Sequence, residues 1–211
     1  GMLVLDLRGN VGGLLSAAVE VCDVFLEEGV IVSTRGRATR EQGGEAAPLD
    51  VRRATRGAAC ADLPVAVLVD GLTASAAEVV AACLQDHGRA VVVGSRSFGK
   101  GTVQTLLPLS DGTGLVKLTT SEYLRPSREN IHRRGDDDGD DAWGVSPDRG
   151  CEIMPSGRQI ETWQAWRRLR DVVPVKGGQA VEPSASPSHA VLPRHVDPVL
   201  AKALDAVRAR E

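Results

Sequence analysis

Apolar residues occur along the chain in short runs, and these runs alternate with segments in which apolar positions recur at helical spacing. The continuous runs at 3–7, 64–69 and 90–93 predict buried strands, because a strand covered on both faces loses its polar alternation. The helical spacing predicts helices at 14–28 and 74–87, each followed by a glycine that ends it. Strands that alternate with helices predict βαβ units and a largely parallel sheet, and therefore an α/β fold.

Further strands are predicted outside this repeat. One covers 30–34, and the charged, glycine-rich segment 35–63 predicts an exposed hairpin or long loop. Two more, at 103–109 and 114–120, flank the turn residues Asp111-Gly112 and predict a β-hairpin added to the core.

The C-terminal part of the chain has a different character. Amphipathic spacing predicts a helix at 158–170, and the richness of 173–196 in Pro, Ser and Gly predicts a linker. A terminal helix is predicted at 197–210, because an Asp N-cap is followed by Pro at the first helical position. We therefore expect a core at 1–150 and a C-terminal extension at 151–211.

Composition and charge exclude some classes of function. Hydrophobic residues make up 42% and charged residues 25% of the chain, as in ordinary globular domains, but aromatic residues only 3%, so the predicted core is aliphatic. The net charge of -3 and a pI near 5.9 argue against a nucleic-acid-binding protein. The four cysteines have no CxxC spacing, which argues against a zinc site and leaves their disulfide state open. They are Cys22, Cys60, Cys83 and Cys151.

The first segment whose residues are suited to catalysis runs from Thr73 to Glu78 and contains Ser75. It lies where a predicted strand turns into a predicted helix. The free N–H groups and the positive dipole end of a helix N-terminus favour negative charge, which suits a nucleophile whose attack produces an oxyanion. The alternative interpretation of Ser75 is an ordinary helix N-cap.

The second segment, Gly94 to Gly101, nearly matches the phosphate-binding loop motif GxxxxGK[ST]. The match fails because Gly101 supplies no hydroxyl for Mg²⁺, and because a strand rather than a helix follows it. Nucleotide binding is therefore disfavoured. Taken alone, Lys100 in this segment has the alternative interpretation of a solvated loop lysine.

The third segment, Asp6 to Gly13, is a strand end that runs into a glycine-rich turn. Backbone amides in such a turn are free to point at a ligand, as an oxyanion hole requires. The alternative is a plain connection from strand to helix.

Taken together, the three segments resemble the catalytic core of the carboxyl-terminal processing peptidases, also called tail-specific proteases. The family's DLRxNxGG turn, its SASAxE-like nucleophile segment and its FGKGxVQ-like loop match 6–13, 73–78 and 98–104, in the family's order. The spacings from Ser75 to Lys100 and from Lys100 to Gln104 also match. The resemblance extends from residue 3 to about residue 150.

This resemblance implies an α/β core of the crotonase and ClpP type and a serine endopeptidase that cleaves proteins near their C-termini by a Ser/Lys dyad. Ser75 would be the nucleophile and Lys100, as the neutral amine, the general base. Gln104 would orient the lysine. Because a lysine amine must be desolvated to act as a base, we expect Phe98 and the nearby apolar strands to bury it.

The backbone amides of Gly12 or Gly13 and of Ala76 are the candidates for the oxyanion hole. The resemblance implies no cofactor and no metal ion. The acidic run 136–141 lacks the spacing of a calcium loop and is interpreted as a solvated loop. The four histidines lie in no matching motif and are interpreted as surface or structural residues: His87, His132, His189 and His195.

Family members carry an N-terminal helical region and a PDZ domain before the first motif, whereas this chain opens directly in the predicted strand 3–7. We therefore expect an N-terminally truncated catalytic core. The partners implied are unfolded proteins or C-terminal tails as substrates, with no nucleic acid, and homo-oligomerisation stays open. The compartment implied is the bacterial periplasm or envelope, or the plastid lumen.

Three alternatives stay open beside the protease. The fold also serves non-catalytic ligand-binding or peptide-binding modules, such as the related retinoid-binding proteins. The chain could instead be an inactive fragment of the protease, or a crotonase-like acyl-CoA enzyme. The retained residues Ser75, Lys100 and Gln104 favour the protease, because neither other fold relative needs them at this spacing.

Overall fold

A parallel sheet of three strands forms the centre of the protein. The computed structural model describes residues 1–36, 49–110, 112–134, 143–171, 175–176, 179–180 and 197–209. The sheet has the order β1-β4-β5 and consists of β1 (Leu3–Asp6), β4 (Val65–Val69) and β5 (Ala90–Gly94). All three strands point the same way, so their carboxyl ends share one edge, and the three segments singled out in the sequence follow directly from it.

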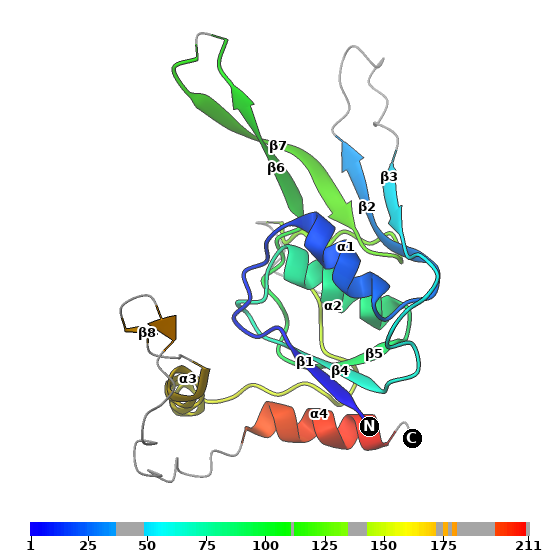
Figure 1. Ribbon diagram of the computed structural model, residues 1–211, viewed down its shortest axis with the longest axis vertical. Coiled ribbons are helices and arrows are strands. Elements are labelled where there is room, and N and C mark those ends of the chain that lie inside the picture. The colour runs from blue at the N-terminus through cyan, green and yellow to red at the C-terminus, as the bar shows by residue number, and fades with distance from the viewer. Residues whose placement is uncertain are drawn as a thin grey trace.

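Helices cover both faces of this sheet (Figure 1). The helices α1 (Leu15–Asp23) and α2 (Ala76–Asp86) pack on one face, and α4 (Pro198–Arg208) packs on the other. The predicted parallel core is therefore confirmed, and the last helix of the C-terminal segment completes it.

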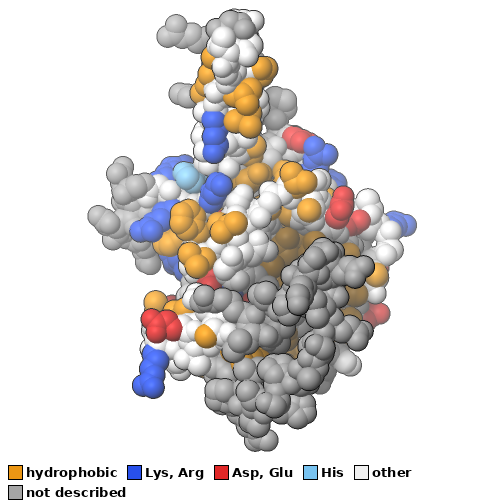
Figure 2. Space-filling model, turned by 60° about the vertical axis from the view of Figure 1, so that its left-hand side comes forward, with side chains coloured by type: hydrophobic (Ala, Val, Ile, Leu, Met, Phe, Trp, Pro, Cys, Tyr) orange, Lys and Arg blue, Asp and Glu red, His pale blue; other side chains and the backbone are white. Residues whose placement is uncertain are grey.

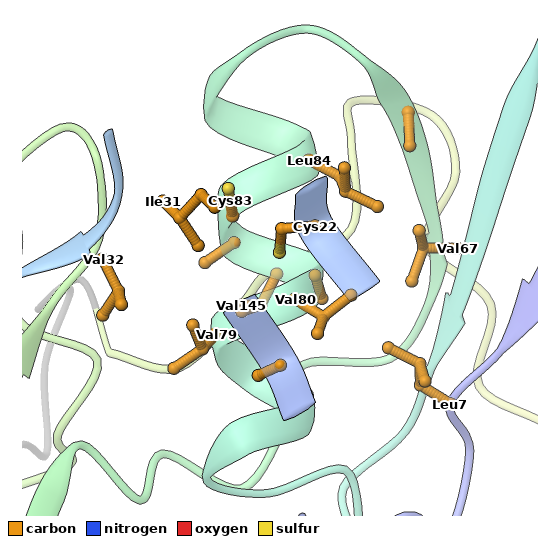
Figure 3. Close-up of a cluster of buried hydrophobic side chains, with 14 of the residues drawn as sticks. Leu7, Cys22, Ile31, Val32, Val67, Val79, Val80, Cys83, Leu84 and Val145 are labelled. Carbon is orange, nitrogen blue, oxygen red and sulfur yellow. The ribbon is translucent and has the colours of Figure 1, made fainter. Parts of the chain in front are cut away.

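Strand side chains alternate between the two faces. Val67 of β4 contributes to the core shared with α1 and α2, whereas Leu68 contributes to the cluster under α4. The larger core is aliphatic, as the low aromatic content predicts, and Figure 3 shows Cys22 and Cys83 within it. Both cysteines are fully buried, and no disulfide joins any two of the four described cysteines.

A second, antiparallel sheet lies beside the core. Its order is β3-β2-β7-β6, formed by β2 (Val30–Gly36), β3 (Asp50–Arg53), β6 (Thr102–Pro108) and β7 (Leu115–Leu124). The predicted hairpin is confirmed as β6 and β7, which extend from the body as a long ribbon with apolar side chains on its surface (Figures 1 and 2).

The first helix is shorter than predicted. It ends at Asp23, where the spacing had extended it to residue 28. The carbonyl of Val24 accepts a hydrogen bond from the amide of Cys60, and the next two side chains, Phe25 and Leu26, are both buried. The chain leaves the helix before these two residues and packs both side chains into the core.

The strand β1 is only half-buried, whereas the sequence predicted a buried strand: its Leu3, Val4 and Leu5 pack against the margins of the two core clusters. The predicted helix at 158–170 is present as α3 (Gly157–Asp171). Part of the predicted linker forms a two-stranded pair, β8 (Val175–Lys176) with β9 (Gln179–Ala180). The rest of that linker and the acidic run 136–141 lie outside the described residues.

No helix in the described ranges is long and apolar enough to span a bilayer.

Candidate active site

Backbone hydrogen bonds join the three candidate segments at the carboxyl edge of the parallel sheet. The amide of Ala74 donates to the carbonyl of Asn10, and the amide of Phe98 donates to the carbonyl of Thr73, each at 2.9 Å. In open α/β sheets this edge is where ligands bind. The structure therefore brings together, in one place, segments that the sequence could only connect by resemblance.

Ser75 occupies the N-cap of α2 in a strained backbone conformation. Its φ of 58° and ψ of −122° lie outside the extended region that N-cap residues usually adopt. Positive φ in a residue with a side chain costs of order 1–3 kcal/mol and persists only where the surroundings impose it. The ordinary N-cap interpretation thus describes the position of Ser75 but does not account for its conformation.

Glu78 is the group that holds this conformation. Its side chain is fully buried, and its carboxylate accepts four hydrogen bonds. Oε2 accepts from the amides of Ser75 and Lys100, each at 2.8 Å. Oε1 accepts from the Ser97 hydroxyl at 2.5 Å and from the amide of Gly99 at 2.7 Å. One carboxylate therefore fixes two segments relative to each other: the turn around Ser75, called the nucleophile turn after its candidate role, and the loop 97–100, called the lysine loop.

The sequence analysis gave Glu78 no role beyond its place in the motif. A local signal was present, because a Glu three residues after a Ser N-cap is the capping-box pattern, in which the Glu side chain accepts from the N-cap amide. That pattern explains the bond from Ser75. It does not reveal the bonds from Ser97, Gly99 and Lys100, which depend on the fold.

Gly12 packs directly against the nucleophile turn. Its φ is 91°, and a Cβ placed on it would lie 2.6 Å from the carbonyl oxygen of Ala74 and 2.9 Å from both the amide nitrogen of Ala76 and the Cβ of Ser75. Only glycine fits this position. The amide of Gly12 donates to Oδ1 of Asn10 at 2.9 Å, so among the oxyanion-hole candidates Gly13 and Ala76 are better placed to offer an amide to a ligand. Ala76 begins α2, where amides have no intrahelical acceptor.

The side chains of Lys100 and Gln104 are exposed. Phe98, which was expected to bury the lysine, is itself 54% exposed. That expectation is wrong for the described residues, because burial alternates along the loop: Ser97 and Gly99 are buried, whereas Phe98 and Lys100 are exposed. Gln104 lies on β6 opposite Thr119, next to a register shift. In the described part of the chain, neither side chain forms a hydrogen bond with Ser75.

An apolar cavity of about 220 Å³ lies beside the nucleophile turn. It is bounded on one side by the backbone of Gly12, Gly13 and Ala76. Aliphatic side chains from β1, α1 and α2 supply much of the rest of its lining: Leu5, Leu7, Ala17, Val21 and Val80. A ligand whose carbonyl lay at Ser75 would have room here for one apolar side chain.

A buried ion-pair network ties the glycine-rich turn to the C-terminal helices. The Arg8 side chain donates to Asp6 and to Asp197, the N-cap of α4, and its guanidinium lies 4.3 Å from the centroid of the Trp163 ring in α3. Burial opposes the charge of Arg8, but the hydrogen bonds to both carboxylates outweigh it and raise the pKa of the guanidinium. The turn that carries Gly12 and Gly13 is therefore anchored by residues from the far end of the chain.

Two of the histidines lie within the described residues. His87 contacts the carbonyl of Val30 through Nε2 at 2.8 Å, as a structural residue would. His132 has a buried Nδ1 for which the structure shows no hydrogen-bond partner. The described ranges contain no cluster of three or more His, Cys, Asp or Glu side chains that could hold a metal ion.

Comparisons with known proteins identify relatives of this chain. Residues 2–149 match the sequence profile of peptidase family S41. The chain is 48% identical over 134 residues to the carboxy-terminal-processing protease of Bartonella bacilliformis, a match that covers 63% of this chain and 29% of that protein. It is 38% identical over 136 residues to the chloroplastic carboxyl-terminal-processing peptidase 1 of Arabidopsis thaliana, covering 63% of this chain and 25% of that protein. The chain thus spans less than a third of the length of these relatives.

Solved structures show the same architecture. The photosystem II D1 C-terminal processing protease superposes with a TM-score of 0.60 at 36% identity, covering 73% of this chain and 35% of that chain. A putative peptidase from Parabacteroides merdae shares the fold, with a TM-score of 0.54 at 19% identity over 85% of this chain and 54% of that chain. The predicted α/β core of the crotonase and ClpP type is confirmed.

Proposed function

The chain belongs to peptidase family S41, and from this membership we propose that it carries the catalytic site of a serine endopeptidase that cleaves polypeptides near their C-termini. The observation that carries the proposal is the shared hydrogen-bond acceptor of Ser75 and Lys100. Because both amides bind Oε2 of Glu78, a nucleophile and a base are held in adjacent loops at the ligand-binding edge of the sheet.

In the proposed reaction, Ser75 Oγ attacks the carbonyl carbon of the scissile peptide bond and its proton passes to the neutral amine of Lys100. The amides of Ala76 and of Gly13 or Gly12 donate to the oxyanion that forms. The C–N bond then breaks, and the Lys100 ammonium returns the proton to the leaving amine. A water molecule, deprotonated by Lys100, hydrolyses the resulting ester and regenerates the Ser75 hydroxyl.

The exposure of Lys100 sets a condition on this reaction. Only a neutral amine accepts a proton, and removal of water favours a neutral amine over an ammonium. We infer that the bound polypeptide covers Lys100 and the exposed ring of Phe98, and desolvates the amine only in the complex. In this proposal Gln104 orients the amine once it is covered.

The cavity beside Gly12 and Ala76 supports a preference for an apolar side chain next to the scissile bond. The names of the relatives support proteins processed at their C-termini as substrates, and the chloroplastic relative supports a plastid compartment. An exported compartment in a bacterium is the alternative from the resemblance. Neither nucleic acid nor a cofactor takes part in the proposed reaction. The division at residue 150 into a catalytic core and an extension, a PDZ domain in the longer protein, and a homo-oligomer remain expectations from the resemblance.

A peptide-binding module without catalysis is the second candidate, because an exposed Lys100 is also what a site without a working base would show. The two candidates differ in the reactivity of Ser75. The test incubates the purified chain with casein and, separately, with a phosphonylating probe directed at serine nucleophiles, and locates the modified residue by mass spectrometry.

The protease proposal expects cleavage by the wild type, loss of cleavage in Ser75→Ala and Lys100→Ala, and modification of Ser75. Lys202→Ala on α4 is the matched control and should cleave normally. Cleavage that persists in Ser75→Ala would overturn the dyad. Binding of casein with neither cleavage nor modification of Ser75 would favour the binding module.

A further inference from the structure

Two guanidinium groups lie against one indole ring on the surface of the protein. Cζ of Arg96 is 4.8 Å and Cζ of Arg133 is 4.6 Å from the centroid of the Trp143 ring. Both arginines are exposed, and within the described ranges neither forms an ion pair. Among the described residues, the indole holds two like charges close together and neither is paired with a carboxylate, so a bound anion would relieve their Coulomb repulsion.

This arginine-tryptophan cluster lies directly beside the lysine loop. A Cβ built on Gly99 would lie 2.8 Å from both Cβ of Arg133 and Cε3 of Trp143, and the amide of Arg133 donates to the carbonyl of Gly99 at 2.9 Å. Gly99 immediately precedes Lys100. The two guanidinium groups therefore lie on the Lys100 side of the candidate active site. On the surface shown in Figure 2, basic side chains gather below the β6–β7 ribbon.

The described residues around the cluster carry more positive than negative charge. Glu78 supplies a buried negative charge underneath, since its Oε1 lies 3.6 Å from the position of a Cβ on Gly144, the neighbour of Trp143. Above it stand three exposed cations: Lys100, Arg96 and Arg133. One buried carboxylate does not neutralise them, so among the described residues at this place the positive charges outnumber the negative ones.

We propose that Arg96, Arg133 and Trp143 form a subsite that binds a carboxylate of the polypeptide substrate, on the Lys100 side of Ser75. A guanidinium matches a carboxylate with two parallel hydrogen bonds, and a guanidinium stacked on an indole is already oriented for them. The proposal rests on the proposed protease function and adds a specificity to it. Two sources supply this group: an Asp or Glu side chain, and the α-carboxylate at the C-terminus of the substrate.

The test uses two pairs of quenched fluorescent peptides with one cleavable sequence. The first pair differs by Glu against Gln on the carboxyl side of the cleaved bond, and the second by a free C-terminal acid against an amide. The wild type is expected to prefer the carboxylate of one pair by about tenfold in kcat/KM, and the responding pair identifies the source. The preference should weaken as salt is raised from 0.05 to 0.5 M, because ions screen exposed charges.

The double variant Arg96→Gln with Arg133→Gln should bring this ratio close to one while still cleaving the neutral peptides. The matched control Arg53→Gln removes an exposed charge from β3, on the far edge of the antiparallel sheet, and should keep the ratio. A ratio near one in the wild type for both pairs would overturn the proposal, and this is also the result expected if the chain's own aspartates at 136–141 filled the subsite. A ratio retained by the double variant would overturn it equally.

A failure of the protease function is recognised separately. If the wild type cleaves none of the peptides, the same pairs are titrated against Ser75→Ala by fluorescence anisotropy. Tighter binding of the carboxylate member, lost in the triple variant that adds both Arg→Gln changes, supports the subsite without catalysis. Equal binding of both members overturns it.

Discussion

The backbone amides of Ser75 and Lys100 donate hydrogen bonds to the same atom, Oε2 of Glu78, each at 2.8 Å. The two nitrogens, from loops that follow different strands, therefore lie no further apart than twice this distance. The other oxygen of Glu78 holds the loop on either side of the lysine through Ser97 and Gly99. One buried carboxylate thus limits the distance between the backbone of the proposed nucleophile and the backbone of the proposed base.

Glu78→Gln is expected to lower the free energy of unfolding. It is also expected to slow cleavage by the molecules that remain folded. Glutamine offers one acceptor oxygen, and its NH₂ group would face two of the four donors, leaving them without an acceptor. Each unsatisfied buried donor costs about 1–3 kcal/mol, so the two together cost about 2–6 kcal/mol. Urea unfolding should show a loss of this size, and the remaining folded protein should cleave casein at least about tenfold more slowly, because misplacement of catalytic groups is costly.

Glu129→Gln is the matched control for this change, since Glu129 is exposed. It should alter the free energy of unfolding by less than about 0.5 kcal/mol. Equal stability and equal cleavage in Glu78→Gln and Glu129→Gln would contradict a positioning role for Glu78.

The sequence was sufficient to predict the central strands and α2. The runs at β4 and β5 are continuous and aliphatic because α1 and α2 cover one face and α4 the other. The convergence of the three motifs follows from parallel topology, since carboxyl ends of parallel strands share an edge. Local sequence patterns predicted these elements because the apolar residues that form each pattern are the ones that the fold buries.

Other features depend on long-range contacts that no local pattern contains. The end of α1 at Asp23 follows from the bond between Val24 and Cys60, and the exposure of Lys100 from the way the loop buries its neighbours. The Arg96–Trp143 contact joins residues from different loops. None of these features has a spacing or composition that a sequence alone could reveal.

Gly12→Ala should disrupt the nucleophile turn. The new Cβ would meet the carbonyl oxygen of Ala74 at 2.6 Å and Cβ of Ser75 at 2.9 Å, so the backbone of one loop must move, and a φ of 91° is unfavourable for alanine as well. We expect a loss of more than about 2 kcal/mol in the free energy of unfolding, from strain and overpacking together. Cleavage by the folded fraction should fall further than in any variant that only weakens stability.

Gly57→Ala separates these two effects. Gly57 has a φ of 105° but open space around the position of its Cβ, so its substitution adds the backbone strain without the collision. It should cost about 1 kcal/mol and leave cleavage unchanged. If both variants lost the same free energy and kept full cleavage, close packing of Gly12 on Ser75 would not matter to the site.

The cysteines should differ sharply in reactivity. Cys60 is half-buried, whereas Cys22 and Cys83 are fully buried. The hydrogen bond with Cys22, together with burial, raises the pKa of the Cys83 thiol and so keeps it protonated. A chromogenic disulfide reagent at pH 8 should therefore label Cys60 first in the native protein and the buried cysteines only after urea is added. Labelling that is as fast in Cys60→Ser as in the wild type would contradict this assignment.

The ionisation of Asp197 makes the stability of the protein depend on pH in the acid range. Burial opposes its ionisation, but the hydrogen bonds from Arg8 and from the amides of Leu200 and Val199 outweigh burial and lower its pKa. The folded protein therefore binds this proton more weakly than the unfolded chain, in which an Asp titrates near about 3.9. The stabilisation is complete above that pH and is lost as the pH falls through the lower, folded-state pKa.

Asp197→Asn keeps an N-cap but removes the charge opposite Arg8, and should cost about 1–3 kcal/mol at pH 7, since this ion pair is mostly buried. Urea unfolding from pH 7 down to pH 3 should show a constant difference from the wild type down to about pH 4 and a shrinking one below it. Because Arg8 lies in the turn that carries Gly12, cleavage should also fall. The control Asp205→Asn breaks an exposed pair with Arg208 on the same helix and should cost less than about 0.5 kcal/mol at any pH. A difference between Asp197→Asn and the wild type that does not change with pH would show that Asp197 acts as a neutral cap and not as the anchor of Arg8.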